Sequence, residues 1–198
     1  MKTKEILKLI FVNPFEKIAG WQALGLGLIA LVITAFIGSY NGAVFDAALS
    51  MHMSFESYPI WIAFAMLAIN LTSIVLMYLI AGVVFSKNFR VIDVVGTVAL
   101  AKVPNIFLAL LAFIPLPILQ AAQTDRTIFM EDPFLLLGSF SFIAFILCSL
   151  ILMVWYITLL YNAFKVSLNI NRNLRIVVFI FALILAIIIS MMVVHRLF

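Results

Sequence analysis

The chain has 198 residues, of which 67% are hydrophobic and only 10% are charged, and its formal net charge is +4. Its mean hydropathy is +1.29, far from the near-even balance of apolar and polar residues in soluble domains. These values exclude a soluble globular domain and indicate a membrane protein. The sequence has no Gly/Ser linker, charge block or low-complexity tract, so we expect one membrane domain over 21–198, preceded by a cytoplasmic segment over 1–20.

The N-terminal segment predicts a short amphipathic helix lying on the membrane surface. In the stretch KTKEILKLIFV the charged residues fall on one helical arc and most apolar residues on another. Asn13 as the N-cap, Pro14 at the first helical position and Glu16 three residues after the cap predict a second short helix that leads into the first span. A disordered basic tail is the alternative, because so short a helix is stable only when it binds a surface.

Long apolar runs predict an all-α integral membrane protein, a bundle of five transmembrane helices. A hydrocarbon layer of ~30 Å needs about 20 apolar residues in a helix. Four spans are predicted at about 21–40, 60–85, 134–161 and 174–194, and the uncharged part of the last begins at Ile176. A fifth span over about 94–119 contains Lys102 and Pro104. Continuous apolar runs favour helices, since the strands of a membrane barrel alternate and are shorter.

The basic residues indicate the orientation of the chain, because short cytoplasmic loops retain Lys and Arg. One side receives Lys2, Lys4, Lys8, Lys17, Lys87, Arg90, Lys102, Lys165, Arg172 and Arg175, whereas only Arg126 and Arg196 fall on the other. We therefore expect a cytoplasmic N-terminus and an outside C-terminus. Contacts with anionic headgroups are expected at Lys87, Arg90, Lys165, Arg172 and Arg175. The positive net charge is not expected to bind nucleic acid.

Aromatic side chains are expected at the water boundaries of the spans, as amphipathic rings prefer. The residues concerned are Trp21, Tyr40, Tyr58, Trp61, Trp155, Tyr156 and Tyr161. The segment between the first two spans carries Asp46, His52 and Glu56 and is expected to be an outside loop. Ordinary packing remains the alternative for any single aromatic residue.

Lys102 and Pro104 interrupt the third span, in the stretch GTVALAKVPNIF. Pro104 has no N–H for the carbonyl of Leu100 and disfavours helical geometry at Val103, so the helix should break or bend there. In one interpretation 91–101 lies shallow on the cytoplasmic side and the lysine reaches the headgroups. In the other, a discontinuous helix lines a polar cavity, as in many secondary transporters.

A candidate polar site surrounds this break. Asn70 lies near the middle of the second span and Asn105 follows the proline, so the two could meet near the carbonyl of Leu100, with Lys102 at the cytoplasmic mouth. Asp93 and Lys102 could pair only if the chain turns around Gly96. The alternative is that the polar side chains bond across helices and hold the spans together, at ~0.6 kcal/mol each on average.

No pattern of catalytic residues, bound cofactor or metal is recognised, and we expect no enzyme. Cys148 lies in an apolar helix and is expected to be a packing residue. Met51, His52 and Met53 could offer soft ligands to copper(I), but one such triplet lacks a second ligand set.

The stretches VIDVVGTVALAKVPNIFLALLAFIP and WYITLLYNAFKVSLNINRNLRIVVFIFALILAIIIS resemble the Yip-domain family of Ypt/Rab-interacting membrane proteins and their bacterial relatives. The resemblance covers most of the chain, from NPFEK to IIIS, and implies five spans with a cytoplasmic N-terminus. It also implies a non-enzymatic role, which in eukaryotic members includes contact with small GTPases and with one another. The long acidic or Pro/Gln-rich segment of many eukaryotic members is absent. GTPase binding is therefore not expected, and the expected location is a bacterial inner membrane.

Two functions are compatible with these residues. The first is a membrane scaffold or adaptor that acts through helix packing and through protein or lipid contacts, including a possible homo-oligomer. The second is a small transporter or channel subunit organised around the Lys102–Pro104 break.

Overall fold

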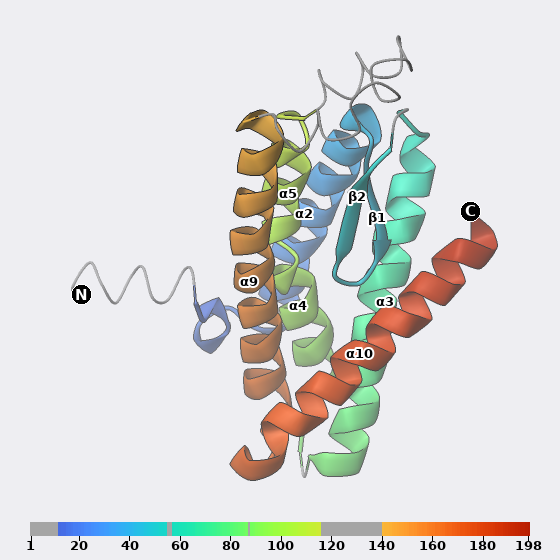
Figure 1. Cartoon of the computed structure of the whole chain (residues 1–198). Helices are drawn as coiled ribbons and strands as arrows, with labels where there is room; N and C mark the ends of the chain where they lie inside the picture. The colour runs from blue at the N-terminus through green and yellow to red at the C-terminus, as the bar shows by residue number, and fades with distance from the viewer. Residues whose placement is uncertain (1–11, 55–56, 87, 116–139) are drawn as a thin grey trace.

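The structure, a computed structural model, describes residues 12–54, 57–86, 88–115 and 140–198 (Figure 1). It is mostly helical, at 78%. The elements in chain order are η1 (Pro14–Glu16), α2 (Gly20–Asn41), β1 (Ala43–Ala47), β2 (Ser50–Met53), α3 (Ile60–Phe85), α4 (Val91–Ala101), α5 (Pro104–Leu111), α9 (Phe140–Leu168) and α10 (Arg172–Leu197). The predicted surface helix before residue 12 lies outside the described residues.

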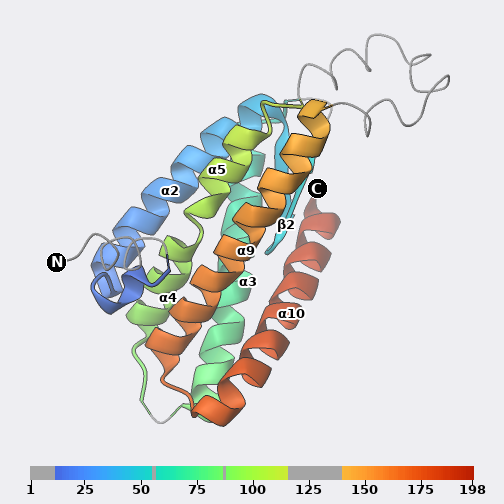
Figure 2. The ribbon, with the colours of Figure 1, turned by 60° about the vertical axis from the view of Figure 1, so that its left-hand side comes forward.

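Among the described residues, five helical segments are long and apolar enough to cross a membrane, as expected of a multi-pass membrane protein. They are α2, α3, the pair α4 and α5 counted together over Val91–Leu111, α9 and α10. Successive segments run in opposite directions along the bundle, and α10 crosses the face of α3 obliquely (Figures 1 and 2).

The helices and the predicted spans differ at three ends. The third span begins at Val91 and its helix ends at Leu111, eight residues before the predicted end, because the chain turns over 112–115. The fourth helix continues to Leu168, past the predicted end at 161. The last helix begins at Arg172. The side chain of Asn171 accepts a hydrogen bond from the backbone N–H of Asn173 and so caps its first turn.

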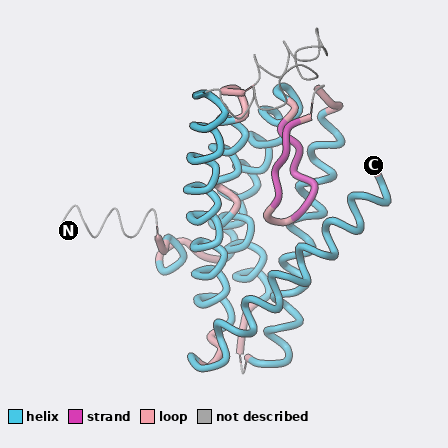
Figure 3. Tube along the Cα trace, viewed as in Figure 1, coloured by secondary structure: helices cyan, strands magenta, loops and turns pink. Residues whose placement is uncertain are grey.

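The predicted outside loop between the first two spans is instead a β-hairpin packed within the bundle. Gly42 adopts the left-handed conformation that ends α2 and turns the chain (φ 74°). The strands β1 and β2 then pair antiparallel, with Val44 opposite His52 and Ala47 opposite Ser50. The hairpin lies among α2, α3 and α10, and its turn points toward the middle of the bundle (Figure 3). The protein is therefore not all-α.

The predicted second N-terminal helix is a single 3-10 turn, η1. Asn13 precedes it but accepts no capping hydrogen bond, and instead its side-chain amide donates to the carboxylate of Glu16 at 2.6 Å. Phe15 is buried in the core, and Asn162 of α9 donates to the backbone oxygen of Val12 at 2.7 Å. This contact fixes the entry of the chain against α9.

Small residues allow α2 and α4 to pack very closely. A Cβ added to Gly27 of α2 would overlap with the backbone of Ala99, and one added to Gly96 of α4 would overlap with the backbone oxygen of Gly20. Close backbone approach of this kind is a common way to associate helices in lipid, where burying apolar surface gives little advantage. Gly96 is thus a packing residue inside a continuous helix, and the chain does not turn there.

We expect Gly96→Ala to destabilise the protein. The added methyl group cannot be accommodated without moving backbone, and overpacking typically costs about 1–3 kcal/mol. The measurement is the midpoint of SDS-induced unfolding in mixed micelles. Gly25→Ala is the control, because nothing lies within 4 Å of a Cβ at Gly25 and Ala favours a helix over Gly. Equal losses in the two variants would contradict the close α2–α4 contact.

Candidate functional site

The break between α4 and α5 is tight and keeps the two helices in one span. The backbone N–H of Lys102 donates to Ala99 and that of Val103 donates to Leu100, both at 3.2 Å. The carbonyl of Leu100 is therefore occupied, contrary to the expectation that Pro104 leaves it free. Val103 also has helical dihedral angles (φ −51°, ψ −39°), so the proline causes one turn of 3-10 geometry rather than a loop.

Lys102 lies in the middle of this span. It follows Val91 by eleven residues and precedes Leu111 by nine, or ~16 Å and ~14 Å of helix at 1.5 Å per residue. Its side chain is only 1% exposed. The interpretation of a shallow lysine that reaches the headgroups was therefore wrong, because the side chain turns into the bundle.

The lysine ammonium bonds to α9 and, through it, to the hairpin. Nζ of Lys102 donates to the hydroxyl of Tyr156 at 3.0 Å. The same hydroxyl donates to the backbone oxygen of Ala48, in the hairpin turn, at 3.1 Å. Tyr156 is 1% exposed. Within the described part of the chain, no carboxylate forms an ion pair with Lys102.

The other polar group of Ala48 is bonded to α10. The backbone N–H of Ala48 donates to Oγ of Ser190 at 2.9 Å, and this hydroxyl donates to the backbone oxygen of Ile187 at 3.0 Å. Ala48 and Ser190 are both buried. The hairpin turn is thus held by side chains of two helices, α9 and α10. We call the four residues Lys102, Tyr156, Ala48 and Ser190 the polar centre.

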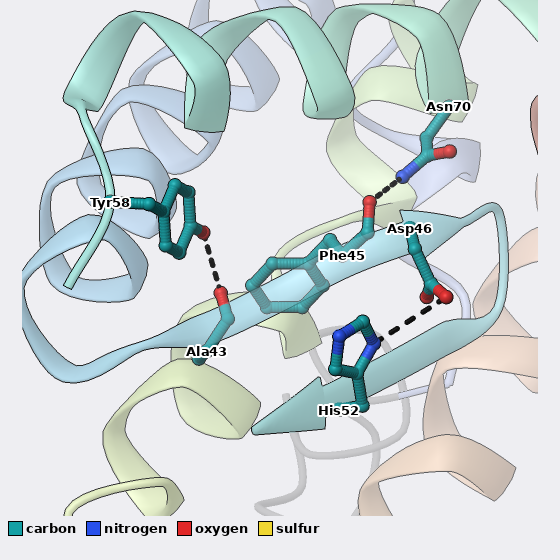
Figure 4. Close-up of polar contacts among 6 residues, drawn as sticks. All are labelled: Ala43, Phe45, Asp46, His52, Tyr58 and Asn70. Atoms are coloured by element: carbon teal, nitrogen blue, oxygen red, sulfur yellow. Dashed lines mark hydrogen bonds and ion pairs between the residues drawn. The ribbon is translucent and has the colours of Figure 1, made fainter. Parts of the chain in front are cut away.

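Side chains of α3 and of the segment just before it also bond to the backbone of β1, nearer the start of the hairpin (Figure 4). Asn70 of α3 donates to the backbone oxygen of Phe45 at 2.8 Å, and the hydroxyl of Tyr58 donates to that of Ala43 at 2.7 Å. Burial raises the pKa of Tyr58 to about 12, so it remains a donor at neutral pH. Oδ1 of Asn70 is buried and has no partner in the described part of the chain.

Two further buried asparagines, Asn41 and Asn105, lie on different helices. Asn41, the last residue of α2, donates to the backbone oxygen of Ala109 at 2.6 Å and accepts from the N–H of Ala43 at 3.1 Å. It therefore joins α2, α5 and the hairpin. Asn105 is buried in the first turn of α5, and no hydrogen bond joins it to Asn70 in the described part of the chain.

Asp93 and Lys102 do not pair. Helix α4 is unbroken between them, which separates them by ~13 Å along the axis. The carboxylate of Asp93 instead lies 3.3 Å from the position of a Cβ built on Gly20. Asp93 and Gly96 thus belong to the α2–α4 contact and lie outside the polar centre.

The two strands of the hairpin are joined by a contact between Asp46 and His52. Oδ2 of Asp46 lies 3.4 Å from Nδ1 of His52, across the two strands (Figure 4). Oδ1 of Asp46 is buried without a partner in that part of the chain. No group of three or more His, Cys, Asp or Glu side chains that could hold a metal ion occurs among the residues described.

The predicted basic contacts lie at the end of the bundle where α3 and α9 end and α4 and α10 begin, here called the basic end. Arg90, Lys165 and Arg172 are exposed there. Arg175 is half-buried and donates twice to the backbone oxygen of Ile170, from Nε at 3.2 Å and from Nη2 at 2.8 Å. Lys87 lies outside the described residues.

Sequence reasoning missed three members of the polar centre. Tyr156 was assigned to a water boundary with its neighbours Trp155 and Tyr161, yet it lies sixteen residues into α9 and is buried. Ala48 and Ser190 carry no signal of their own. The available clue was the stretch AVFDAALSMHM, which is unusually apolar for a loop in water.

Comparisons of the chain with protein families, with curated proteins and with solved structures give no match.

We expect Tyr156→Phe to destabilise the protein and loosen the hairpin. The change leaves the ammonium of Lys102 and the carbonyl of Ala48 without their common partner, and an unsatisfied buried group costs about 1–3 kcal/mol. In a Cys148→Ala background, a thiol placed at Leu49 in the hairpin turn should react faster with a maleimide when Tyr156 is replaced.

Tyr161→Phe is the matched control on the same helix. The ring of Tyr161 packs 5.3 Å from that of Phe179, and its hydroxyl makes no hydrogen bond within the described part of the chain. This variant should keep the original labelling rate and stability. Identical rates in both phenylalanine variants would contradict the role given to Tyr156.

Proposed function

We propose that this chain is a small, non-enzymatic transporter or channel subunit for a small anion, organised around the polar centre. One observation carries the proposal: the ammonium of Lys102 lies in the middle of a span, 1% exposed, with a tyrosine hydroxyl as partner. An ionisable group at this depth costs about 2.5–3.5 kcal/mol on insertion scales, and such groups mark solute or ion pathways.

A purely structural role does not require a lysine. A hairpin carbonyl can be held by a neutral side chain, as Asn70 and Tyr58 hold the carbonyls of Phe45 and Ala43. Tyr156 alone would hold the carbonyl of Ala48 in the same way. The lysine adds a group that can carry charge, and a solute of opposite charge is the natural ligand for it.

The backbone around Lys102 has the irregular form that membrane proteins allow at binding sites. The helix is broken at the lysine, and a non-helical segment, the hairpin, reaches the same point from the other direction. Non-helical backbone at membrane depth occurs where protein or a water-filled cavity surrounds it, and broken helices form solute sites in many transporters. With Tyr156 bonded to Ala48, the hairpin turn closes the centre.

We expect Lys102→Met to abolish anion flux. Purified protein is reconstituted in proteoliposomes, and the flux of chloride, nitrate and acetate is followed with an entrapped anion-sensitive dye. Methionine keeps the volume and helix propensity of lysine without the amine, so folding should be retained.

Lys165→Met is the matched control, because Lys165 is an exposed lysine of α9 at the basic end. It should leave flux unchanged. No flux above that of protein-free vesicles, or equal flux in both methionine variants, would contradict the transport proposal.

The second candidate is a membrane scaffold or adaptor. The packing of the polar centre favours it, since Lys102, Tyr156 and Ser190 are all 1% exposed or less. The resemblance to the Yip-domain family supports the same role through protein or lipid contacts, with a homo-oligomer or another membrane protein as partner. A folded, flux-inactive protein in which Lys102→Met changes nothing would favour this candidate.

We further infer that the basic end faces the cytoplasm of a bacterial cell, so that the N-terminus lies inside and the C-terminus outside the inner membrane. The exposed Arg90, Lys165 and Arg172 support this orientation, because cytoplasmic segments retain basic residues. A fluorescent reporter should be active at the N-terminus, and an alkaline phosphatase reporter at the C-terminus. Reporters that place both ends in one compartment would contradict the five-span orientation.

A further inference from the structure

The hairpin has one apolar face and one polar face. Side chains alternate across a strand, so Met51 and Met53 lie on one face of β2, and Ser50 and His52 lie on the other. The two methionines pack in an apolar cluster with residues of α2, α3 and α5. Asp46 of β1 belongs to the polar face, because its carboxylate contacts His52 and the two side chains point toward one another (Figure 4).

The polar face leads from the end of the bundle opposite the basic end to the polar centre. His52 lies opposite Val44, close to the end of α2. Ser50 lies ~7 Å further along the strand, directly after the turn whose Ala48 is bonded to Tyr156. The row of polar side chains therefore starts near the end of the bundle and stops beside the polar centre.

This face of the hairpin is open between two helices. Helices α9 and α10 both bond to the hairpin turn but contact each other little, and β2 lies between them (Figure 2). The side chain of His52 is 54% exposed and that of Asp46 is 33% exposed. Ionisable side chains within a membrane protein face its interior or a water-filled cavity, because lipid leaves them without partners. We therefore expect water between α9 and α10 along the polar face.

The charge on this face is set by Asp46 and His52. The helices α2 and α3 contain no Asp, Glu, Lys, Arg or His. The other titratable or charged side chains described in this half of the bundle are Tyr40, Tyr58, Tyr156, His195 and Arg196. Two of the tyrosines are bonded to hairpin carbonyls, and the other three residues are exposed. Oδ1 of Asp46 has no partner in the described part of the chain, so His52 is the side chain that offsets its charge there.

One proton changes the net charge of this pair. Histidine is the side chain that usually gains a proton between pH 8 and pH 5. With a neutral His52, the pair carries the negative charge of the Asp46 carboxylate, which repels an anion. With a protonated His52, the two charges cancel. Uptake of a proton by the imidazole therefore removes an electrostatic barrier in front of the polar centre.

We propose that the polar face of the hairpin is the route of an anion from the outer end of the bundle to Lys102, and that Asp46 and His52 form a proton-operated gate in this route. The inference rests on the proposed function, because it assigns an access route and a regulation to the same site. Acidification opens the route by cancelling the charge of Asp46.

The gate is tested by chloride flux into proteoliposomes, measured at about pH 5.5 and at about pH 7.5, within the range in which histidine usually titrates. We expect about fivefold faster flux at the lower pH, which corresponds to about 1 kcal/mol, the interaction of two unit charges ~4 Å apart in water. His52→Gln should be slow at both pH values, because Asp46 stays charged. Asp46→Asn should be fast at both.

His195→Gln is the matched control, because the chain has two histidines and His195 is exposed near the end of α10. It should keep the pH response of the original chain. Flux that requires Lys102 but does not respond to pH, or a response that persists in His52→Gln, would overturn the gate and leave the transport proposal standing. Absence of flux in every variant would overturn both.

The route has a second test that does not depend on flux. In a Cys148→Ala background, Ser50→Cys in lipid nanodiscs is treated with a negatively charged methanethiosulfonate, which reacts only in water. We expect rapid labelling of this thiol. Met51→Cys, on the apolar face of the same strand, and Ile151→Cys, on α9 and 69% exposed where we expect lipid, should stay unlabelled. An unlabelled Ser50→Cys, or equal labelling of the three thiols, would overturn the route.

Discussion

The structure depends on the need of every backbone N–H and C=O group for a partner where water is absent. The helices satisfy their own groups, but a two-stranded hairpin leaves the outer edge of each strand unpaired. Here side chains from the helices and from the segment before α3 bond to several of the hairpin's backbone groups. Tyr58, Asn70 and Tyr156 hold three carbonyls of the hairpin and Ser190 holds an N–H. Asn70, Tyr156 and Ser190 are therefore polar residues of the spans whose partners lie in the hairpin.

Lys102 belongs to this network of hydrogen bonds, but the hairpin does not need its charge. The tight turn before Pro104 interrupts the helix at the depth where the hairpin ends, so one hydroxyl, that of Tyr156, connects the lysine with the hairpin turn. The ammonium carries a desolvation cost that the neutral partners of the hairpin do not. Its burial in the middle of a span is what makes Lys102 a candidate for function.

The five spans could be predicted from the sequence because an uncharged run of sufficient length has few alternatives in lipid. The hairpin could not be predicted, since AVFDAALSMHM carries neither a strong turn signal nor strict alternation. Two of its hydrogen-bond partners, Tyr156 and Ser190, lie more than 100 residues further along the chain. The break at Pro104 was predicted, but its geometry was not. Pro104 cannot donate to the carbonyl of Leu100, and the N–H of Val103 donates to it instead. The local sequence does not predict this 3-10 geometry, because packing in the bundle selects it.

Helix α10 extends from an apolar groove beside α3 to the polar centre. It packs mainly on α3 and on β1, and much less on α9. One part, from Leu174 to Leu185, forms a wall of the apolar groove, and another carries Ser190, which holds the hairpin turn. Because a helix of this length moves largely as a rigid element, a change in its distance from α3 also changes the position of Ser190. The hydrogen bond of Ser190 therefore links the position of the hairpin turn to the packing of α10 on α3.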